Sequence, residues 1–593
     1  MRKRTIALAA AALAAAAPAP ARAEATVQRV DVPSFDGTRL GGWVIKPAGA
    51  RGKLPAILIS TPYFGQCVKV SSLGRGPCWP TPETPADWAE HPEPVEFLVE
   101  SGYAVGWFSV RGTGVSGGCW DDMGRREQRD QRVLVEWLAS RPWSSGRVGA
   151  MGLSAMSATA LGAAVERPRA LKTIVVSGVN ADLYTFNFSP QGLAAGWTLL
   201  GSEATYGTDI SHVPPGLLRP DPALTVAQAP HQHERACPEV ARTMTAPLGG
   251  AVTGHRDAGF YEERDMTRRY GRIRASVLIA QGLQDLWQSG HMMQEDAMWS
   301  LLRAPKAMYV GQWAHTYPWQ SGHSWSPSRE DLKAEWLELL RSWLDHHLRK
   351  GPKPSILGRA RFEDDSRRWH ESRAWPPHEA RDEALYLAPS GGLTPEPPAA
   401  PGAQTFRAYP QAERVTLPRA FLCPAWLDPV EGPGSLVYMT RPVTKRTVIA
   451  GNPMAYLDLT ADQAGGGLQV TLHDVAPDFT CGNDPARRSP AGARKLTVGG
   501  ADLRFHHGGY DARPFGGGHV RVDIANLATV LEPGDRLAIT VSYGDPIEFA
   551  EVGHAPRITV HSGPRADSSQ LVVPVLEGGF GGREPKTRFP PRP

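Results

Sequence analysis

Three residues of the types that cooperate in nucleophilic catalysis occur along this chain in the order serine, acid, histidine. Ser154 follows Gly152-Leu153, Asp285 closes the segment 282–285, and His315 closes the segment 311–315. A serine hydroxyl is a weak nucleophile until a histidine accepts its proton, and that histidine needs a carboxylate to fix its tautomer. The three residues therefore predict acyl-transfer hydrolysis with Ser154 as the nucleophile.

Each of the three residues follows a short apolar run that is typical of a buried strand. These runs span residues 148–151, 277–280 and 307–310, and similar runs occur at 56–59, 103–108 and 173–176. Runs that are apolar on both faces suit a parallel sheet, and helical spacing over 128–138 and 332–348 places helices between or after them. The alternation predicts a doubly wound α/β core in which strand ends meet at one edge. The chain order serine, acid, histidine is that of the α/β-hydrolases.

The surroundings of Ser154 favour a nucleophile elbow. The serine lies between a strand and the small-residue helix predicted over 155–165, and Gly152 leaves room for the two to approach closely. The competing interpretation is an ordinary helix N-cap. Ser157 is an alternative nucleophile, although no glycine precedes it by two positions. Met156, two residues after Ser154, is not the small residue that an elbow favours.

Hydrolysis through a tetrahedral intermediate also needs donors for the oxyanion. The backbone N–H of Ala155 is one candidate, and the hydroxyl of Tyr63, which follows the strand at 56–59, is the second; a half-buried aromatic at a strand end is the alternative role for Tyr63. Trp287 either lines an acyl pocket or packs in the core. Phosphate-binding and dinucleotide-binding motifs are absent from the sequence, so no cofactor is expected, and a metal site is not expected either.

Residues 1–23 have the composition of a secretory signal peptide. A basic start is followed by an apolar run, and Ala21-Arg22-Ala23 supplies the small residues before a cut at Glu24. We therefore expect an exported protein, periplasmic or extracellular, without a membrane span. Removing this segment changes 64 Lys and Arg to 60, against 60 Asp and Glu, so the formal net charge falls from +4 to 0. The mature charge gives no support for a nucleic-acid partner.

The six cysteines form an even set, as in exported proteins with disulfides. Their order suggests three pairs among 15 possible pairings: Cys67–Cys78, Cys119–Cys237 and Cys423–Cys481. A C-x-x-C pair is absent from the sequence, which argues against structural zinc.

Changes of pattern along the chain predict five segments. Residues 1–23 are the signal peptide, 24–179 and 269–352 are the two parts of the α/β-hydrolase core, and 180–268 are a mainly helical cap inserted into it. From 353 to 593, helical periodicity gives way to short alternating runs at 468–472, 520–524 and 537–541. Such runs predict an all-β, jelly-roll-like sandwich.

Several motifs taken together resemble the X-prolyl dipeptidyl peptidases and their relatives, cocaine esterase and the α-amino-acid ester hydrolases. The likeness covers nearly the whole mature chain and rests on the segments 61–63, 111–119 and 142–149, on Gly152-x-Ser154, Gly282-Leu283-x-Asp285 and Trp313-x-His315, and on 385–387, 474–478 and 531–537 in the C-terminal part. It implies a Ser154, Asp285 and His315 triad, with Tyr63 and the Ala155 amide as the oxyanion hole. The family usually shows G-x-S-Y-x-G, whereas Ala155 and Ser157 stand here in place of Tyr and the second Gly.

These observations lead to three hypotheses. The first is a secreted serine hydrolase that works through an acyl-enzyme on X-Pro dipeptides at the amino terminus of small peptides. The second is a carboxylic or α-amino-acid ester hydrolase of the cocaine-esterase type. The third, motivated by Ala155 and Ser157, is a catalytically diverged binding protein on the same fold. The oligomeric state is left open.

Overall fold

A computed structural model describes the chain in fourteen stretches. They are residues 25–62, 94–179, 181–189, 191–195, 237–240, 258–285, 296–318, 329–407, 427–428, 432–477, 493–507, 512–543, 549–550 and 554–585. The predicted signal peptide and most of the predicted cap lie outside these residues. Among the helices so described, none is long and apolar enough to cross a membrane.

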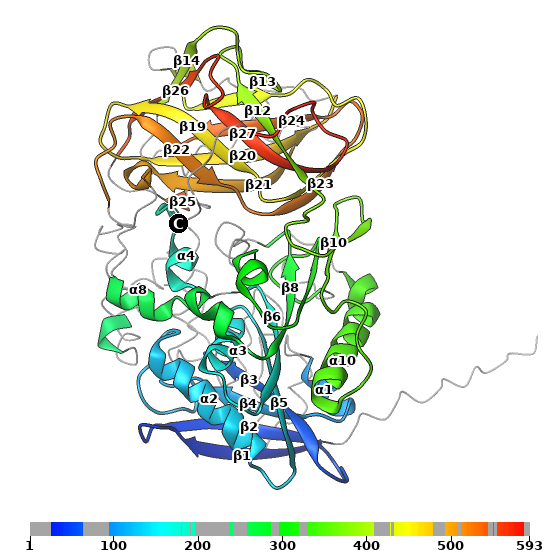
Figure 1. Ribbon diagram of the computed structural model, residues 1–593. Helices are drawn as coiled ribbons and strands as arrows, with labels where there is room; N and C mark the ends of the chain where they lie inside the picture. The colour runs from blue at the N-terminus through cyan, green and yellow to red at the C-terminus, as the bar shows by residue number, and fades with distance from the viewer. Residues whose placement is uncertain are drawn as a thin grey trace, which may run out of the picture.

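A twisted sheet, ten-stranded as far as the described residues show, forms the first domain (Figure 1). Its order is β1-β2-β4-β3-β5-β6-β8-β9-β10-β11, with parallel pairing from β4 through β10 and antiparallel pairing at both ends. Because the order reverses between β4, β3 and β5, the carboxyl ends of β3 and β5 flank a topological switch point, where α/β proteins bind ligands. The strands are β1 (Ala25–Pro33), β2 (Arg39–Pro47), β3 (Leu54–Thr61), β4 (Ala104–Ser109), β5 (Ser144–Leu153), β6 (Leu171–Ser177), β8 (Ser276–Gly282), β9 (Lys306–Gly311), β10 (Ala360–Glu363) and β11 (Trp369–Ser372).

Helices cover both faces of this sheet, as the apolar runs predicted. Helices α2 (Arg125–Ala139) and α3 (Ala155–Glu166) lie on one face, and α1 (Val95–Glu100) and α10 (Lys333–Arg349) lie on the other (Figure 1). Two separate apolar cores result, one on each face. Helix α10 buries the predicted face, whose members are Trp336, Leu340, Trp343 and Leu344. The predicted doubly wound α/β core is confirmed.

The sheet extends farther along the chain than the sequence suggested. The predicted sandwich begins at residue 353, yet β10 pairs in parallel with β9, and β11 pairs with β10. These two strands therefore belong to the hydrolase sheet. Their short alternating pattern resembles that of sandwich strands, because an edge hairpin has one exposed face in either setting.

The C-terminal domain is a sandwich of antiparallel sheets around its own apolar core. One sheet contains β12 (Arg381–Leu387), β13 (Leu393–Thr394), β14 (Gly402–Arg407), β18 (Thr447–Gly451), β19 (Met454–Ala461), β22 (Gly518–Asp523), β23 (Leu527–Leu531), β26 (Arg557–Ser562) and β27 (Gln570–Glu577). The other contains β17 (Ser435–Met439), β20 (Gly467–Val475), β21 (Ala493–Asp502) and β24 (Arg536–Ser542). The sandwich lies over the carboxyl edge of the hydrolase sheet (Figure 1).

The described parts of the cap are short. They are α4 (Leu183–Asn187), β7 (Ala194–Ala195), which pairs with β25 (Phe549–Ala550) of the C-terminal domain, residues 237–240, and α8 (Ala258–Arg264). Cys119 and Cys237 form a disulfide that joins the loop after β4 to the cap, while Cys67, Cys78, Cys423 and Cys481 lie outside the described residues. The remaining elements are the short pair β15 (Leu427–Asp428) and β16 (Gly432–Pro433), and the 3-10 turns η4 (Thr267–Arg272), η5 (Glu330–Leu332) and η6 (Leu503–Phe505).

Candidate active site

Ser154 occupies a strained turn between β5 and α3. Its backbone has φ +61° and ψ −128°, a conformation that non-glycine residues rarely adopt. The turn is held because the Ser154 N–H donates to the Ser177 carbonyl at 2.9 Å, while its carbonyl accepts from the amides of the following helix. Strain of this kind persists only where surrounding structure imposes it, and it is the geometry of a nucleophile elbow. The structure therefore favours the elbow over an ordinary N-cap, and the Ser154 side chain makes no cap hydrogen bond.

Two neighbours of Ser154 show how the unusual motif fits this turn. A Cβ at Gly152 would overlap the backbone of Met156, so the glycine permits the approach that brings the larger Met156 into the turn. Met156 then packs into the apolar core with Leu153. Ser157 is fully buried, and its hydroxyl donates to the Ser154 carbonyl at 2.6 Å. Ser157 thus acts as part of the turn, which argues against it as the nucleophile.

Asp285 and His315 lie together at the ends of β8 and β9. Nδ1 of His315 is 2.7 Å from Oδ2 of Asp285, and the two side chains are 9% and 1% exposed. With Nδ1 facing the carboxylate, Nε2 is the ring nitrogen left to exchange a proton with a nucleophile. The loops that carry them are tied by bonds from the Leu283 N–H to the Gly311 carbonyl at 2.7 Å and from the Gln284 N–H to the Trp313 carbonyl at 3.0 Å.

The end of β6 connects the serine with the histidine. The Ser177 carbonyl holds the Ser154 amide, and the next residue, Gly178, lies directly against the His315 ring. A Cβ at Gly178 would be 2.8 Å from Cε1 of His315, and φ at this glycine is +54°. Ser154 and His315 therefore both lie against the end of β6, one on Ser177 and the other on Gly178.

Gln281 is a member of this site that the sequence analysis missed. Its side chain is buried in β8, where Oε1 accepts from the Gly178 N–H at 2.9 Å and Nε2 lies 3.3 Å from Oδ2 of Asp285. One amide thus joins the backbone beside His315 to the carboxylate that orients it. A glutamine inside an apolar strand was the available signal, because a buried amide needs partners.

The predicted oxyanion hole is described only in part. Ala155 is the first residue of α3, where amide N–H groups have no partner within the helix and can stabilise an anion. This is the position expected for one oxyanion donor. Tyr63 and Trp287 lie outside the described residues.

Carboxylates are the groups that would bind a substrate amine, and three of them follow Tyr261 in the cap. Glu262 pairs with Arg268, Glu263 accepts from the Arg125 N–H at 2.7 Å, and Asp265 pairs with Arg268 at 3.0 Å. All three carboxylates are engaged by the protein itself. This described part of the cap therefore offers no support for amine recognition.

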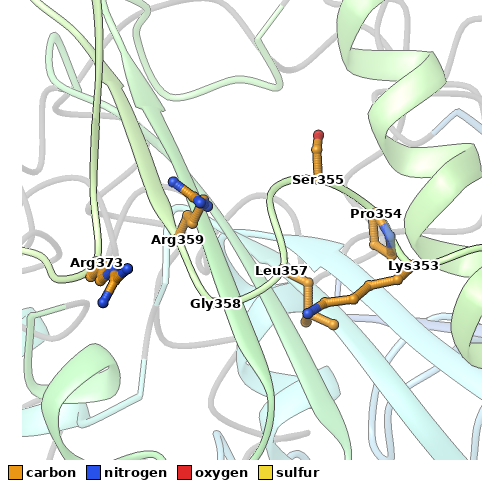
Figure 2. A pocket seen from close by; sticks show the side chains of 7 residues that line it. All are labelled: Lys353, Pro354, Ser355, Leu357, Gly358, Arg359 and Arg373. Carbon is orange, nitrogen blue, oxygen red and sulfur yellow. The ribbon is translucent and has the colours of Figure 1, made fainter.

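Two further features lie apart from the triad. Burial raises the pKa of Asp122 to about 7 and that of Glu127 to about 8, in the loop and helix that follow β4. A cavity of about 410 Å³ lies at the amino end of β10, at the edge of the sheet opposite to Ser154 (Figure 2). Its lining is cationic and polar and consists of Lys353, Pro354, Ser355, Leu357, Gly358, Arg359 and Arg373.

Comparison with known proteins gives a consistent result for both domains. The family model described as X-Pro dipeptidyl-peptidase (S15 family) matches residues 36–317, and the model of the X-Pro dipeptidyl-peptidase C-terminal non-catalytic domain matches residues 351–571. Both parts of the chain are thus similar to the two domains of one kind of enzyme.

Individual relatives carry peptidase and esterase names. A "Putative Xaa-Pro dipeptidyl-peptidase" of Streptomyces avermitilis is 24% identical over 86% of this chain and 76% of its own length. A "Putative serine esterase" of Mycobacterium bovis is 24% identical over 91% of this chain and 94% of its own length. Among solved structures, an α-amino acid ester hydrolase superposes with a TM-score of 0.69 at 19% identity, covering 95% of this chain and 98% of that one, which shows a shared fold.

Proposed function

Because the chain belongs to the X-Pro dipeptidyl-peptidase and cocaine-esterase-like family of serine hydrolases, we propose that Ser154, His315 and Asp285 are its catalytic triad. The observation that carries this proposal is the 2.7 Å contact between His315 Nδ1 and Asp285 Oδ2, beside the same strand end that holds the strained Ser154. Asp285 accepts the Nδ1 hydrogen, which leaves Nε2 of His315 as the base.

The reaction proceeds in two acyl transfers. Ser154 Oγ attacks the substrate carbonyl while His315 takes the hydroxyl proton, and the Ala155 N–H donates to the developing oxyanion. His315 returns the proton to the leaving amine or alcohol, which leaves an acyl-enzyme on Ser154. Water then attacks the acyl group by the same route in reverse, His315 again taking and returning one proton, and the free acid departs.

The substrate that we propose is an X-Pro dipeptide at the amino terminus of a peptide. Both family models, which together span most of the chain, support it. The test compares hydrolysis of Ala-Pro, Ala-Ala and N-acetyl-Ala-Pro p-nitroanilides. Cleavage of Ala-Pro anilide alone is expected, because a dipeptidyl peptidase reads both the proline and the free amine.

The second candidate is an ester hydrolase. It is favoured by the engagement of the Glu262, Glu263 and Asp265 carboxylates within the protein and by the near full-length match to the mycobacterial relative. Turnover of p-nitrophenyl esters without cleavage of any of the three anilides would assign this activity instead. Hydrolysis assays with the anilides and the esters therefore distinguish the two substrate classes.

We further propose that the protein is exported and processed near Ala23. The Cys119–Cys237 disulfide supports this, since such bonds persist in oxidising compartments. Expression of the full chain followed by amino-terminal sequencing of the periplasmic and medium fractions is expected to give Glu24 as the first residue. An intact Met1 on all of the protein would contradict it.

A further inference from the structure

Gln312, at the start of the loop that follows β9, has every one of its hydrogen-bonding groups occupied. Its N–H donates to Glu363 Oε2 at 3.2 Å, and its carbonyl accepts from Arg329 Nη1 at a longer 3.4 Å. Its side-chain Oε1 accepts from Gln284 Nε2 at 2.8 Å. Its Nε2 donates to the Glu363 carbonyl at 3.0 Å and to the Ala528 carbonyl at 3.1 Å. One buried residue thus joins four distant segments of the chain.

Glu363 is a fixed acceptor because Arg329 holds both of its carboxylate oxygens. Nη1 and Nη2 of Arg329 donate to Oε2 at 2.7 Å and Oε1 at 2.9 Å, and the two side chains are only 5% and 1% exposed. Nε and Nη2 of Arg329 also donate to the Asp331 carboxylate, at 3.0 and 2.9 Å. A bidentate, buried ion pair is strong and geometrically specific, and it costs much to break on one side.

Ala528 adds the C-terminal domain to this arrangement. It lies in β23 of the sandwich, whereas Gln312 and Glu363 follow or end strands of the hydrolase sheet. The sandwich therefore contacts the loop that carries His315 through a buried, specific hydrogen bond. An apolar contact would stabilise the interface equally well without fixing the position of an amide.

We propose that Gln312, Arg329, Glu363 and the Ala528 carbonyl form a histidine-loop clamp that sets the position of His315, three residues after Gln312. Gln312 and Glu363 are positioning residues in this account, and the sandwich supports catalysis as well as stability. The inference rests on the proposed function, because it requires His315 to be the base. A displacement of about 1 Å at a reacting group costs on the order of 100-fold in rate.

The test measures the rate at which a fluorophosphonate labels the full-length enzyme, together with kcat and KM for the hydrolysed substrate. Labelling reports activation of the serine without substrate binding. Gln312→Met keeps the side-chain length and removes the amide, so we expect labelling and kcat to fall by about 10- to 100-fold with KM within twofold. The labelling rate and kcat are expected to fall in Glu363→Gln as well. If either variant does not fold, Gln284→Met serves instead. It removes one hydrogen bond to the Gln312 side chain, and we expect the labelling rate and kcat to fall by about three- to tenfold.

Asp365 provides a matched control at the same interface. It accepts from the Val530 N–H at 2.9 Å and pairs with Arg494 at 2.7 Å, so its carboxylate binds the sandwich beside Ala528 rather than the described part of the histidine loop. Asp365→Ala is expected to lower the melting temperature and leave the labelling rate within twofold. Equal losses in Asp365→Ala and Gln312→Met, or an unchanged rate in Gln312→Met, would overturn the clamp. Absence of labelling in the wild type would instead overturn the proposed function.

Discussion

The nucleophile elbow and the histidine loop hold their catalytic side chains by different means. At the elbow, the chain around Ser154 is fixed by close backbone packing, with Gly152 against Met156 and the Ser154 amide on the Ser177 carbonyl. At the histidine loop, hydrogen bonds from polar side chains of other segments fix the loop and Asp285, among them bonds made by Glu363 and Gln281. The elbow is local in sequence, whereas the histidine loop depends on residues far away in the chain.

This difference implies different tolerances to substitution. A turn fixed by backbone contact has no room for an added methyl group, because protein interiors are close-packed. A loop fixed by side-chain hydrogen bonds accepts small changes of volume but not the loss of a partner, since a buried polar group left without one is costly. Steric substitutions should therefore disrupt the elbow, and isosteric ones should disrupt the histidine loop.

The largest effect is expected from an isosteric change at the histidine loop. Asp285→Asn preserves the shape of the side chain but favours the wrong tautomer of His315, so kcat should fall by about 10,000-fold while the fold is retained. The measurement is kcat with the best substrate, with circular dichroism to check folding. As a control, Asp345→Asn changes a carboxylate of α10 that binds Tyr103 and Arg349, and it should leave kcat within twofold. A loss below tenfold in Asp285→Asn would remove Asp285 from the triad.

A single added methyl group at the elbow is expected to destabilise the fold. Gly152→Ala places a Cβ onto the Met156 backbone and should lower the free energy of unfolding by more than about 4 kcal/mol, the range of severe core disruption. Gly162→Ala is the matched control in the adjoining helix, because its Cβ would lie 3.5 Å from Gln128 in ordinary contact. That control should gain about 0.5 to 1 kcal/mol from helix propensity. Urea unfolding of both variants checks the pair, and similar losses in both would contradict the steric account.

A substitution at Gly178 tests the region where the two modes of support meet. Gly178→Ala brings a methyl group to 2.8 Å from His315 Cε1 and forces alanine into φ +54°. We expect the ring to move and kcat to fall by about 100-fold, at a stability cost of about 1 to 2 kcal/mol. Parallel measurement of kcat and the unfolding free energy separates the effects. An unchanged kcat would mean that the histidine ring has more freedom than its packing indicates.

A smaller effect is expected from a buried carboxyl that belongs to neither region. Burial raises the pKa of Glu127 to about 8 in the folded state, above the ordinary value of 4.5. The folded state therefore holds the proton more tightly than the unfolded state. The protonated Glu127 carboxyl contributes its full stabilisation of the fold below about pH 4.5, and this stabilisation is lost as the pH rises through about 8. Glu127→Gln should be more stable than the wild type at pH 9, by a few kcal/mol, and should lose this advantage at pH 5. Urea unfolding at both pH values measures the difference, and a gain of equal size at pH 5 would contradict the assignment to Glu127 ionisation.

The contrast between the two regions also explains what the sequence could predict. Strand ends, the small-residue helix after Ser154 and the order of Ser154, Asp285 and His315 are local patterns, and the strands and helices predicted for the α/β core appear in the structure. Gln281 and Gln312 were not predicted, because a lone glutamine in an apolar segment indicates that its amide needs partners but does not identify them, and one partner of Gln312 lies 216 positions away. The pairing of β10 with the hydrolase sheet was missed for the same reason, since strand partners are set by tertiary packing.

The most direct test of the central claim is active-site labelling of the intact protein with a fluorophosphonate probe. A serine activated by a histidine reacts covalently with such a probe, whereas an ordinary surface serine does not. We predict stoichiometric labelling of the wild type, with the modified peptide containing Ser154. Labelling should be abolished in Ser154→Ala and retained in Ser157→Ala. Failure of the wild type to react, or labelling that survives Ser154→Ala, would contradict the assignment of Ser154 as the nucleophile.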